Sequence, residues 1–175
     1  MIQQILPDLN TTLCDTLQQM FGQSSWRNIK RKNLNTLPDF QDYMVCIQVQ
    51  GENEEGELIL TFTSSTAETL LHMIDIKNAD VSRTKLLHSV LGELANVVTC
   101  QLMTCPSFLE HFGSVSISPP FVWDAHCPQE GCIPLRKGCQ GSVCKGGKSI
   151  KTFIAASKAH AHEVNVYKDE TMENN

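Results

Sequence analysis

Hydrophobic residues near the N-terminus repeat every three or four positions, which predicts an amphipathic helix. Leu13 and Leu17 lie one turn apart within residues 8–23. Asn10 and Thr11 are candidate N-caps for this helix, because a side-chain oxygen at that position can accept a hydrogen bond from an otherwise unpaired backbone N–H. Gly22 is the expected end of the helix.

The next part of the chain changes to a period of two. Alternating apolar and polar residues predict two strands, 43–50 and 57–62, joined by a turn rich in Gly and Glu. The run that follows, 65–74, predicts a short helix with Ser65 as its N-cap and Glu68 as the capping-box partner. We therefore expect a β-hairpin followed by a helix.

The longest periodic run, about 81–103, predicts a long helix. Residues 113–123 then predict a strand that stops at Pro119 and Pro120, because proline has no N–H to donate to a neighbouring strand. One or two further strands are expected after Ser149.

The length and net charge of the chain limit the number of domains and the kinds of partner to be expected. The chain has 175 residues and is 41% hydrophobic, which is enough for one core but short for two domains. Its net charge of -5 and pI of 5.6 argue against a nucleic-acid partner, which would require clustered Lys and Arg. The one early basic run, 26–33, is interpreted as a solvated loop or helix end.

The sequence also indicates a compartment. It contains no run of about eighteen apolar residues, and its first ten residues lack the charged and apolar regions of a secretory signal. We therefore expect a cytoplasmic protein without membrane contact. Thiols stay reduced in the cytoplasm, so the eight cysteines are not interpreted as four structural disulfides.

A polar stripe runs along the predicted long helix. At about 100° per residue, Ser89, Glu93 and Asn96 share one narrow face. The residues expected to pack on the sheet lie opposite: Leu87, Leu91, Leu94 and Val98. Asn is a poor helix-interior residue, and Gly92 costs about 1 kcal/mol relative to Ala. An Asn and a Gly in the helix interior are easier to explain if this polar face binds a partner. Gly92 would then leave the surface beside Glu93 and Asn96 low and open. An ordinary solvated face is the alternative.

The spacing of this stripe resembles a known signature. Read forward from Ser89, the sequence is Ser-x-x-x-Glu-x-x-Asn, followed by twenty-two residues and Pro119. This is similar to the motif of the CheC, CheX and FliY chemotaxis phosphatases, and the likeness covers roughly residues 5–122. The Glu-x-x-Asn motif occurs once, as in CheX, whereas CheC and FliY typically carry two copies.

The resemblance implies a fold and a domain layout. The expected fold is α+β of the CheC-like type, with a central, mostly antiparallel sheet and long helices packed on it. Residues 1–168 would form a single CheX-like domain with a cysteine-rich loop inserted at about 126–148 and a flexible tail at 169–175. CheX is a homodimer, so the resemblance implies a homodimer here.

The resemblance also implies an activity, the hydrolysis of the aspartyl phosphate of a CheY-like response regulator. Asn96 would position the attacking water and Glu93 would pair with the regulator's lysine, while Ser89 and Pro119 would support the site. The regulator supplies the Mg²⁺, so no cofactor of the protein's own is expected for catalysis. Two other interpretations stay open: a non-catalytic binding module of the flagellar-switch type, and a metal or redox sensor built on this fold.

Four cysteines fall within one short window that lacks apolar periodicity and is interpreted as a loop. They are Cys127, Cys132, Cys139 and Cys144. Gly and Pro beside them permit the tight turns of a structural zinc site. The spacing departs from the Cys-x2-Cys arms of common zinc ribbons, however. Structural zinc, disulfides and uncoordinated thiols are all compatible with this pattern.

Overall fold

A computed structural model describes residues 2–22, 25–74, 82–126 and 136–158. Its helical elements are η1 (Ile2–Gln4), α1 (Ile5–Phe21), α2 (Ser64–His72), α3 (Arg83–Leu102) and α4 (Pro106–Phe112). Its strands are β1 (Arg27–Thr36), β2 (Tyr43–Gly51), β3 (Glu54–Phe62), β4 (Val115–Ile117), β5 (Phe121–Asp124), β6 (Gly138–Lys145) and β7 (Lys148–Lys158).

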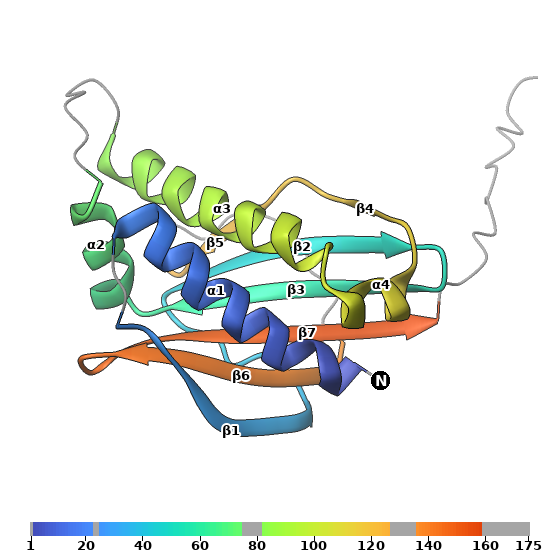
Figure 1. The fold of residues 1–175 in the computed structure, drawn as a ribbon. Helices are drawn as coiled ribbons and strands as arrows, with labels where there is room; N and C mark the ends of the chain where they lie inside the picture. The colour runs from blue at the N-terminus through green and yellow to red at the C-terminus, as the bar shows by residue number, and fades with distance from the viewer. Residues whose placement is uncertain (1, 23–24, 75–81, 127–135, 159–175) are drawn as a thin grey trace, which may run out of the picture.

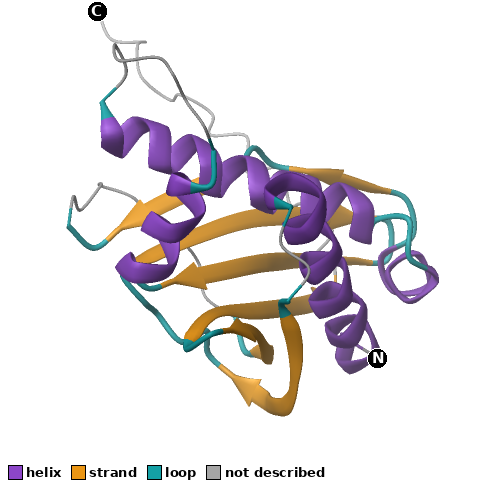
Figure 2. Cartoon of the chain, turned by 60° about the vertical axis from the view of Figure 1, so that its left-hand side comes forward, coloured by secondary structure: helices purple, strands orange, loops and turns teal. Residues whose placement is uncertain are grey.

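The strands form one sheet, and the helices lie on one of its faces (Figures 1 and 2). The described sheet has seven strands in the order β1-β6-β7-β3-β2-β4, with β5 also pairing with β2. The strand pairs are antiparallel. The expected α+β architecture with a mostly antiparallel sheet is therefore confirmed.

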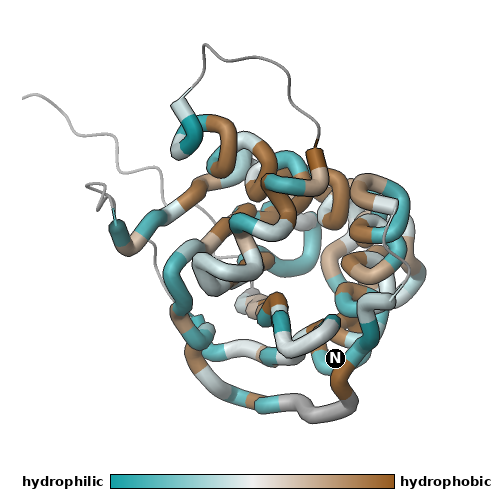
Figure 3. The backbone as a smooth tube through the Cα atoms, turned by 90° about the vertical axis from the view of Figure 1, so that its left-hand side faces the viewer, coloured by the Kyte–Doolittle hydropathy of each residue, from teal (hydrophilic) through white to brown (hydrophobic). Residues whose placement is uncertain are grey.

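The hydrophobic core lies between the helices and the sheet. The four leucine and valine positions predicted to face inward on the long helix are buried there, together with Leu9, Leu13 and Leu17 of α1. Figure 3 shows hydrophobic and hydrophilic positions alternating along the helical turns. Among the described residues, no single helix is long and apolar enough to cross a membrane; the bent pair of α3 and α4 meets that test only by length and composition.

The opposite face of the sheet is crossed by residues 37–42, which connect β1 to β2. The Asp39 N–H donates to Gln140 Oε1 at 2.7 Å, and Thr61 Oγ1 donates to the Asp39 carbonyl oxygen at 3.1 Å. Lys151 forms an ion pair with Asp39. A second apolar cluster lies on this face of the sheet: Met44, Cys46, Ile59, Phe153 and Ala155.

The first helix begins earlier than predicted. α1 starts at Ile5, so the expected N-caps Asn10 and Thr11 both lie inside the helix, and Asn10 is buried. Asn10 Nδ2 donates to Asn28 Oδ1 at 2.9 Å, and Thr152 Oγ1 donates to Asn10 Oδ1 at 2.5 Å. The side chain links the helix to the sheet instead of capping it. The predicted end is confirmed, since Gly22 has a φ of 63° and closes the helix.

The capping of the short helix was also predicted wrongly. Thr63, not Ser65, is the N-cap of α2, and its side chain accepts from the Thr66 N–H at 3.2 Å. Glu68 forms an ion pair with Arg83 on the next helix. The Glu68 carboxylate therefore forms a tertiary ion pair and does not take part in a capping box.

The basic run 26–33 belongs to an edge strand, not to a loop or helix end. β1 pairs with β6, with register shifts between Ile29 and Asn33 and between Leu34 and Thr36. An edge strand exposes one row of backbone groups and tolerates Lys and Arg, so it need not show apolar alternation.

The cysteine-rich window is a loop only in part. Residues 138–145 form β6, which lies inside the sheet, and β7 begins at Lys148. A Cβ at Gly138 would lie 2.2 Å from the Ile154 carbonyl oxygen, and one at Gly141 would lie 2.8 Å from Asn10 Nδ2. Close packing thus requires glycine at both positions. Because glycine is typical of loops, the sequence pattern did not indicate a strand here. Residues 127–135 and the predicted tail lie outside the described residues.

Candidate functional site

The polar stripe of α3 faces away from the core, as predicted. Ser89 and Glu93 are exposed and Asn96 is half-buried. Ser82 caps the helix, and its Oγ accepts from the Lys85 N–H at 3.3 Å. The packing face opposite is at most 3% exposed. A rigid, core-packed helix therefore presents the carboxylate of Glu93 and the amide of Asn96 on one outward side.

Gly92 does not leave the surface open, so that expectation was wrong. The glycine is buried, and a Cβ built on it would lie 3.6 Å from Pro120 Cβ and 3.7 Å from Val122 Cγ2. These are ordinary van der Waals distances. The segment around β5 covers Gly92 and forms one border of the polar stripe.

α3 and β5 run antiparallel beside each other (Figure 1). His88 Nε2 lies 3.1 Å from Asp124 Oδ2, and Gly92, one turn later, lies against Val122 and Pro120. Four helical residues rise about 6 Å, close to the rise of two strand residues. Continued for one more turn, this register would bring Asn96 level with the Ser118–Pro119 segment.

The Ser118–Pro119 segment is held to the neighbouring strand. Ser118 Oγ accepts from the Gln48 N–H at 3.0 Å and donates to the Pro119 carbonyl oxygen at 3.0 Å. The Ser118 N–H donates to the Gln48 carbonyl oxygen at 2.9 Å. Pro119 is itself exposed. The proline of the sequence motif thus sits on a fixed segment that borders the stripe.

A buried polar network adjoins the N-terminal half of the stripe, and sequence reasoning missed it. Asp124 is 2% exposed and accepts from the His126 N–H at 2.8 Å. The Tyr43 ring lies edge-on to the His88 ring, with centroids 6.4 Å apart. Burial, followed by the Asp124 charge, raises the pKa of Tyr43. Two features of the sequence could have indicated this network: His88 lies at the border of the polar stripe, and Asp124 lies at the end of a strand.

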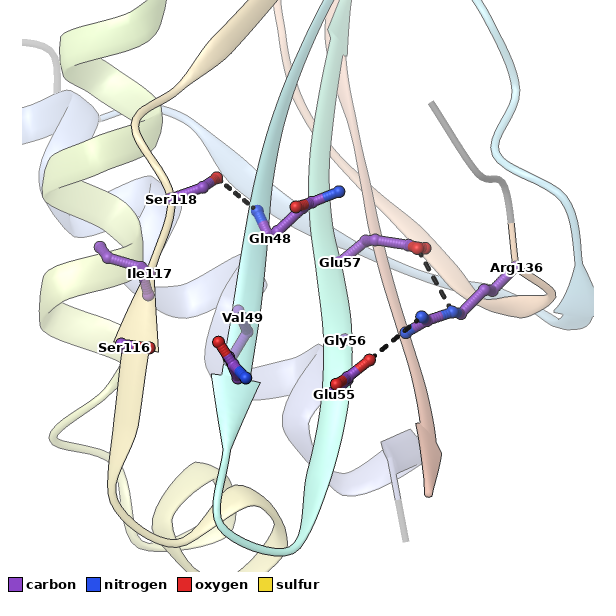
Figure 4. A pocket seen from close by; sticks show the side chains of 10 residues that line it. Gln48, Val49, Glu55, Gly56, Glu57, Ser116, Ile117, Ser118 and Arg136 are labelled. Carbon is purple, nitrogen blue, oxygen red and sulfur yellow. Dashed lines mark hydrogen bonds and ion pairs between the residues drawn. The ribbon is translucent and has the colours of Figure 1, made fainter. Parts of the chain in front are cut away.

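A second polar site lies on the other face of the sheet (Figure 4). It is a pocket of about 340 Å³, lined by Gln48, Val49, Gln50, Glu55, Gly56, Glu57, Ser116, Ile117, Ser118 and Arg136. Arg136 Nε lies 3.5 Å from Glu57 Oε1. Burial raises the pKa of Glu57, and the Arg136 charge only partly offsets this. The sheet separates this pocket from the helices.

The two described cysteines of the window are not arranged to share a metal ion. Cys139 is buried in the core and Cys144 is half-buried. Five strand residues separate their Cα atoms by about 16 Å. Thiolates of one zinc site lie about 2.3 Å from the ion. Cys127 and Cys132 lie outside the described residues, and elsewhere in the described chain no group of three His, Cys, Asp or Glu side chains could hold a metal.

Neither a protein-family model nor a curated protein matches the chain. Solved structures do match its fold. CheX from Vibrio vulnificus is 14% identical with a TM-score of 0.67, covering 88% of this chain and 99% of that one. CheX from Borrelia burgdorferi, in a complex with CheY, BeF3 and Mg²⁺, is 17% identical with a TM-score of 0.64, covering 87% and 97%.

The chain has the CheC-like fold. The resemblance seen in the sequence is thereby confirmed at the level of the fold. The fold alone does not assign an activity, because it is shared with FliM from a FliM–SpeE complex of H. pylori, at 8% identity and a TM-score of 0.56, covering 87% of this chain and 83% of that one. The choice between a phosphatase and a non-catalytic binding module therefore depends on the side chains on α3.

Proposed function

We propose that the protein is a CheX-type phosphatase that accelerates hydrolysis of the aspartyl phosphate of a CheY-like response regulator in chemotaxis signalling. The supporting observation is that Glu93 and Asn96 lie on one outward side of α3. The helix stands on a fold shared with CheX proteins, one of which was solved in a complex with CheY.

The chemistry required of such a protein is limited. The regulator supplies its own Mg²⁺ and lysine, so the partner has to place a water in line with the leaving oxygen. An amide suits this role, because its carbonyl oxygen accepts from water while its NH₂ donates, and it brings no negative charge near the phosphoryl group. Asn96 is the residue that positions this water. The reaction requires no nucleophile and no cofactor from this protein.

Glu93 is one turn away and more exposed than Asn96. In this proposal its carboxylate pairs with the regulator's lysine and fixes the angle at which Asn96 enters the phosphorylation site. Ser89 lies a further turn back and shapes the contact surface, and Pro119 borders it from the β4–β5 connection. A rigid helix bordered by a fixed segment suits a site that works by positioning.

The proposed partner is the phosphorylated form of a CheY-like regulator, met in the cytoplasm. Homodimerisation is proposed by analogy with CheX. Size-exclusion chromatography with light scattering tests the dimer separately from the activity.

The alternative is a non-catalytic, flagellar-switch-type binding module, which the fold match to FliM permits. Such modules lack the Glu and Asn pair of the phosphatases, so the presence of Glu93 and Asn96 favours the enzyme. A binding module would associate with the regulator without changing the lifetime of its phosphate.

The experiment is to mix the purified protein with a CheY-like regulator carrying radioactive phosphate and to follow the loss of label. The proposal predicts first-order loss that accelerates with protein concentration and requires Mg²⁺. Loss at the regulator's own rate, despite measurable binding, would favour the non-catalytic module.

A further inference from the structure

The His88–Asp124 pair lies beside the polar stripe, outside the residues of the sequence motif. His88 Nε2 and Asp124 Oδ2 are 3.1 Å apart, and their side chains are 20% and 3% exposed. The pair joins α3 to the end of β5 across 36 residues of sequence. It therefore links the helix that carries Asn96 to the strand that follows Pro119.

The environment of Asp124 keeps this pair in one geometry. One carboxylate oxygen faces His88, and the other accepts from the His126 N–H at 2.8 Å. The Tyr43 ring lies edge-on to both histidine rings, with centroids 6.4 and 6.1 Å apart. The groups facing His88 thus come from the strands β2 and β5, and packing and hydrogen bonding together hold its ring in place.

The next contact along the helix gives little directional restraint. Gly92 has no side chain that could interlock α3 with β5. The nearest atoms of Pro120 and Val122 are apolar carbons. Apolar contact is non-directional, whereas a hydrogen bond to a buried carboxylate fixes both distance and angle. Of the described contacts between α3 and β5, the directional one is therefore that between His88 and Asp124.

Asn96 is two helical turns from His88, about 12 Å along the axis. A displacement of the helix at His88 is carried directly to Asn96 because α3 is continuous from Arg83 to Leu102. Catalysis by positioning is sensitive to such changes, since a misplacement of about 1 Å can cost about 100-fold in rate.

We propose that His88 and Asp124 are positioning residues that set the place of Asn96 relative to Pro119. They touch neither the regulator nor the water, and act through the register of α3 on β5. The inference rests on the proposed phosphatase function for its kinetic consequences, while its structural part concerns Asn96 alone.

The test compares three variants with the wild type. His88→Ala removes the donor, and His88→Gln restores an amide N–H at about the position of Nε2. Arg83→Ala is the control, because it removes the exposed Arg83–Glu68 ion pair from the same helix without touching β5. Thermal unfolding establishes that each variant is folded before its kinetics are measured.

With phosphorylated regulator, His88→Ala is expected to lower kcat about tenfold and to change KM less than about twofold. His88→Gln should recover most of the lost rate, and Arg83→Ala should match the wild type. A rise in KM at unchanged kcat would mean that His88 contacts the partner, and an unchanged kcat in folded His88→Ala would also overturn the proposal.

A second measurement is independent of activity. In NMR spectra, His88→Ala should shift the side-chain amide resonances of Asn96 and His88→Gln should return them toward their wild-type values. If the wild type does not accelerate dephosphorylation, the proposed function fails, yet the Asn96 resonances still decide whether this pair positions that side chain. Resonances unmoved by His88→Ala would overturn the inference even in an active enzyme.

Discussion

Gly92 of α3 lies directly beneath Pro120, and a Cβ added at Gly92 would meet the proline Cβ at 3.6 Å. At this distance a single methyl group makes an ordinary van der Waals contact. We predict that Gly92→Ala preserves the fold and raises the free energy of unfolding by about 0.5–1 kcal/mol, because alanine favours the helix. Urea denaturation measures the change.

A larger side chain at the same position serves as the contrast. Gly92→Val must displace Pro120, and with it the segment that borders Asn96, so stability and dephosphorylation rate should both fall. A Gly92→Val variant with unchanged stability would show that the helix and the prolines do not pack as described.

Glu93 is expected to act in partner binding. We predict that Glu93→Ala raises the KM for the phosphorylated regulator about tenfold, because it removes the charged partner of the regulator's lysine. Glu93→Gln should show an intermediate loss. Raising the ionic strength should narrow the gap between wild type and Glu93→Ala, since salt screens exposed charges. An unchanged KM in Glu93→Ala would remove this residue from the interface.

Glu57 makes stability depend on pH. Burial raises its pKa above the ordinary 4.5, so the folded state binds the proton more tightly than the unfolded state does. The charged carboxylate therefore destabilises the fold at neutral pH, and this cost disappears as the pH falls through the raised value toward 4.5. We predict that Glu57→Gln is more favourable relative to wild type at pH 7 than at pH 4.5.

Denaturant unfolding at the two pH values measures that difference. Glu55→Gln is a matched control, since Glu55 also pairs with Arg136 but is less buried. A Glu57→Gln difference that grows toward acid would contradict the direction of the pKa shift.

The sequence patterns predicted α3 and its stripe well because two features agree there. The apolar residues that pack on the sheet and the polar residues that face outward both follow the helical period. The hairpin 43–62 was predicted from its alternating, β-favouring residues and its turn rich in Gly and Glu, although its strands are buried on both faces over most of their length. Local periodicity is sufficient wherever one face of an element is buried and the other is not.

Other parts depend on contacts that no local pattern encodes. β1 is a basic edge strand, and β6 contains Gly138 and Gly141 because neighbouring groups leave no room for a side chain. At the site, the motif gave Glu93 and Asn96, but Pro120 covering Gly92 became visible only in the fold. The His88–Asp124 contact spans 36 residues and is likewise a product of tertiary structure.

The most direct test of the proposed phosphatase function compares Asn96→Ala with the wild type in the loss of radioactive phosphate from a CheY-like regulator. Cys100→Ala is the matched control, because Cys100 is exposed on the same face of α3, one turn beyond Asn96. We predict that Asn96→Ala stays folded, still binds the regulator and loses about 100-fold in accelerated dephosphorylation, while Cys100→Ala keeps the wild-type rate. Equal rates for Asn96→Ala and the wild type would contradict it.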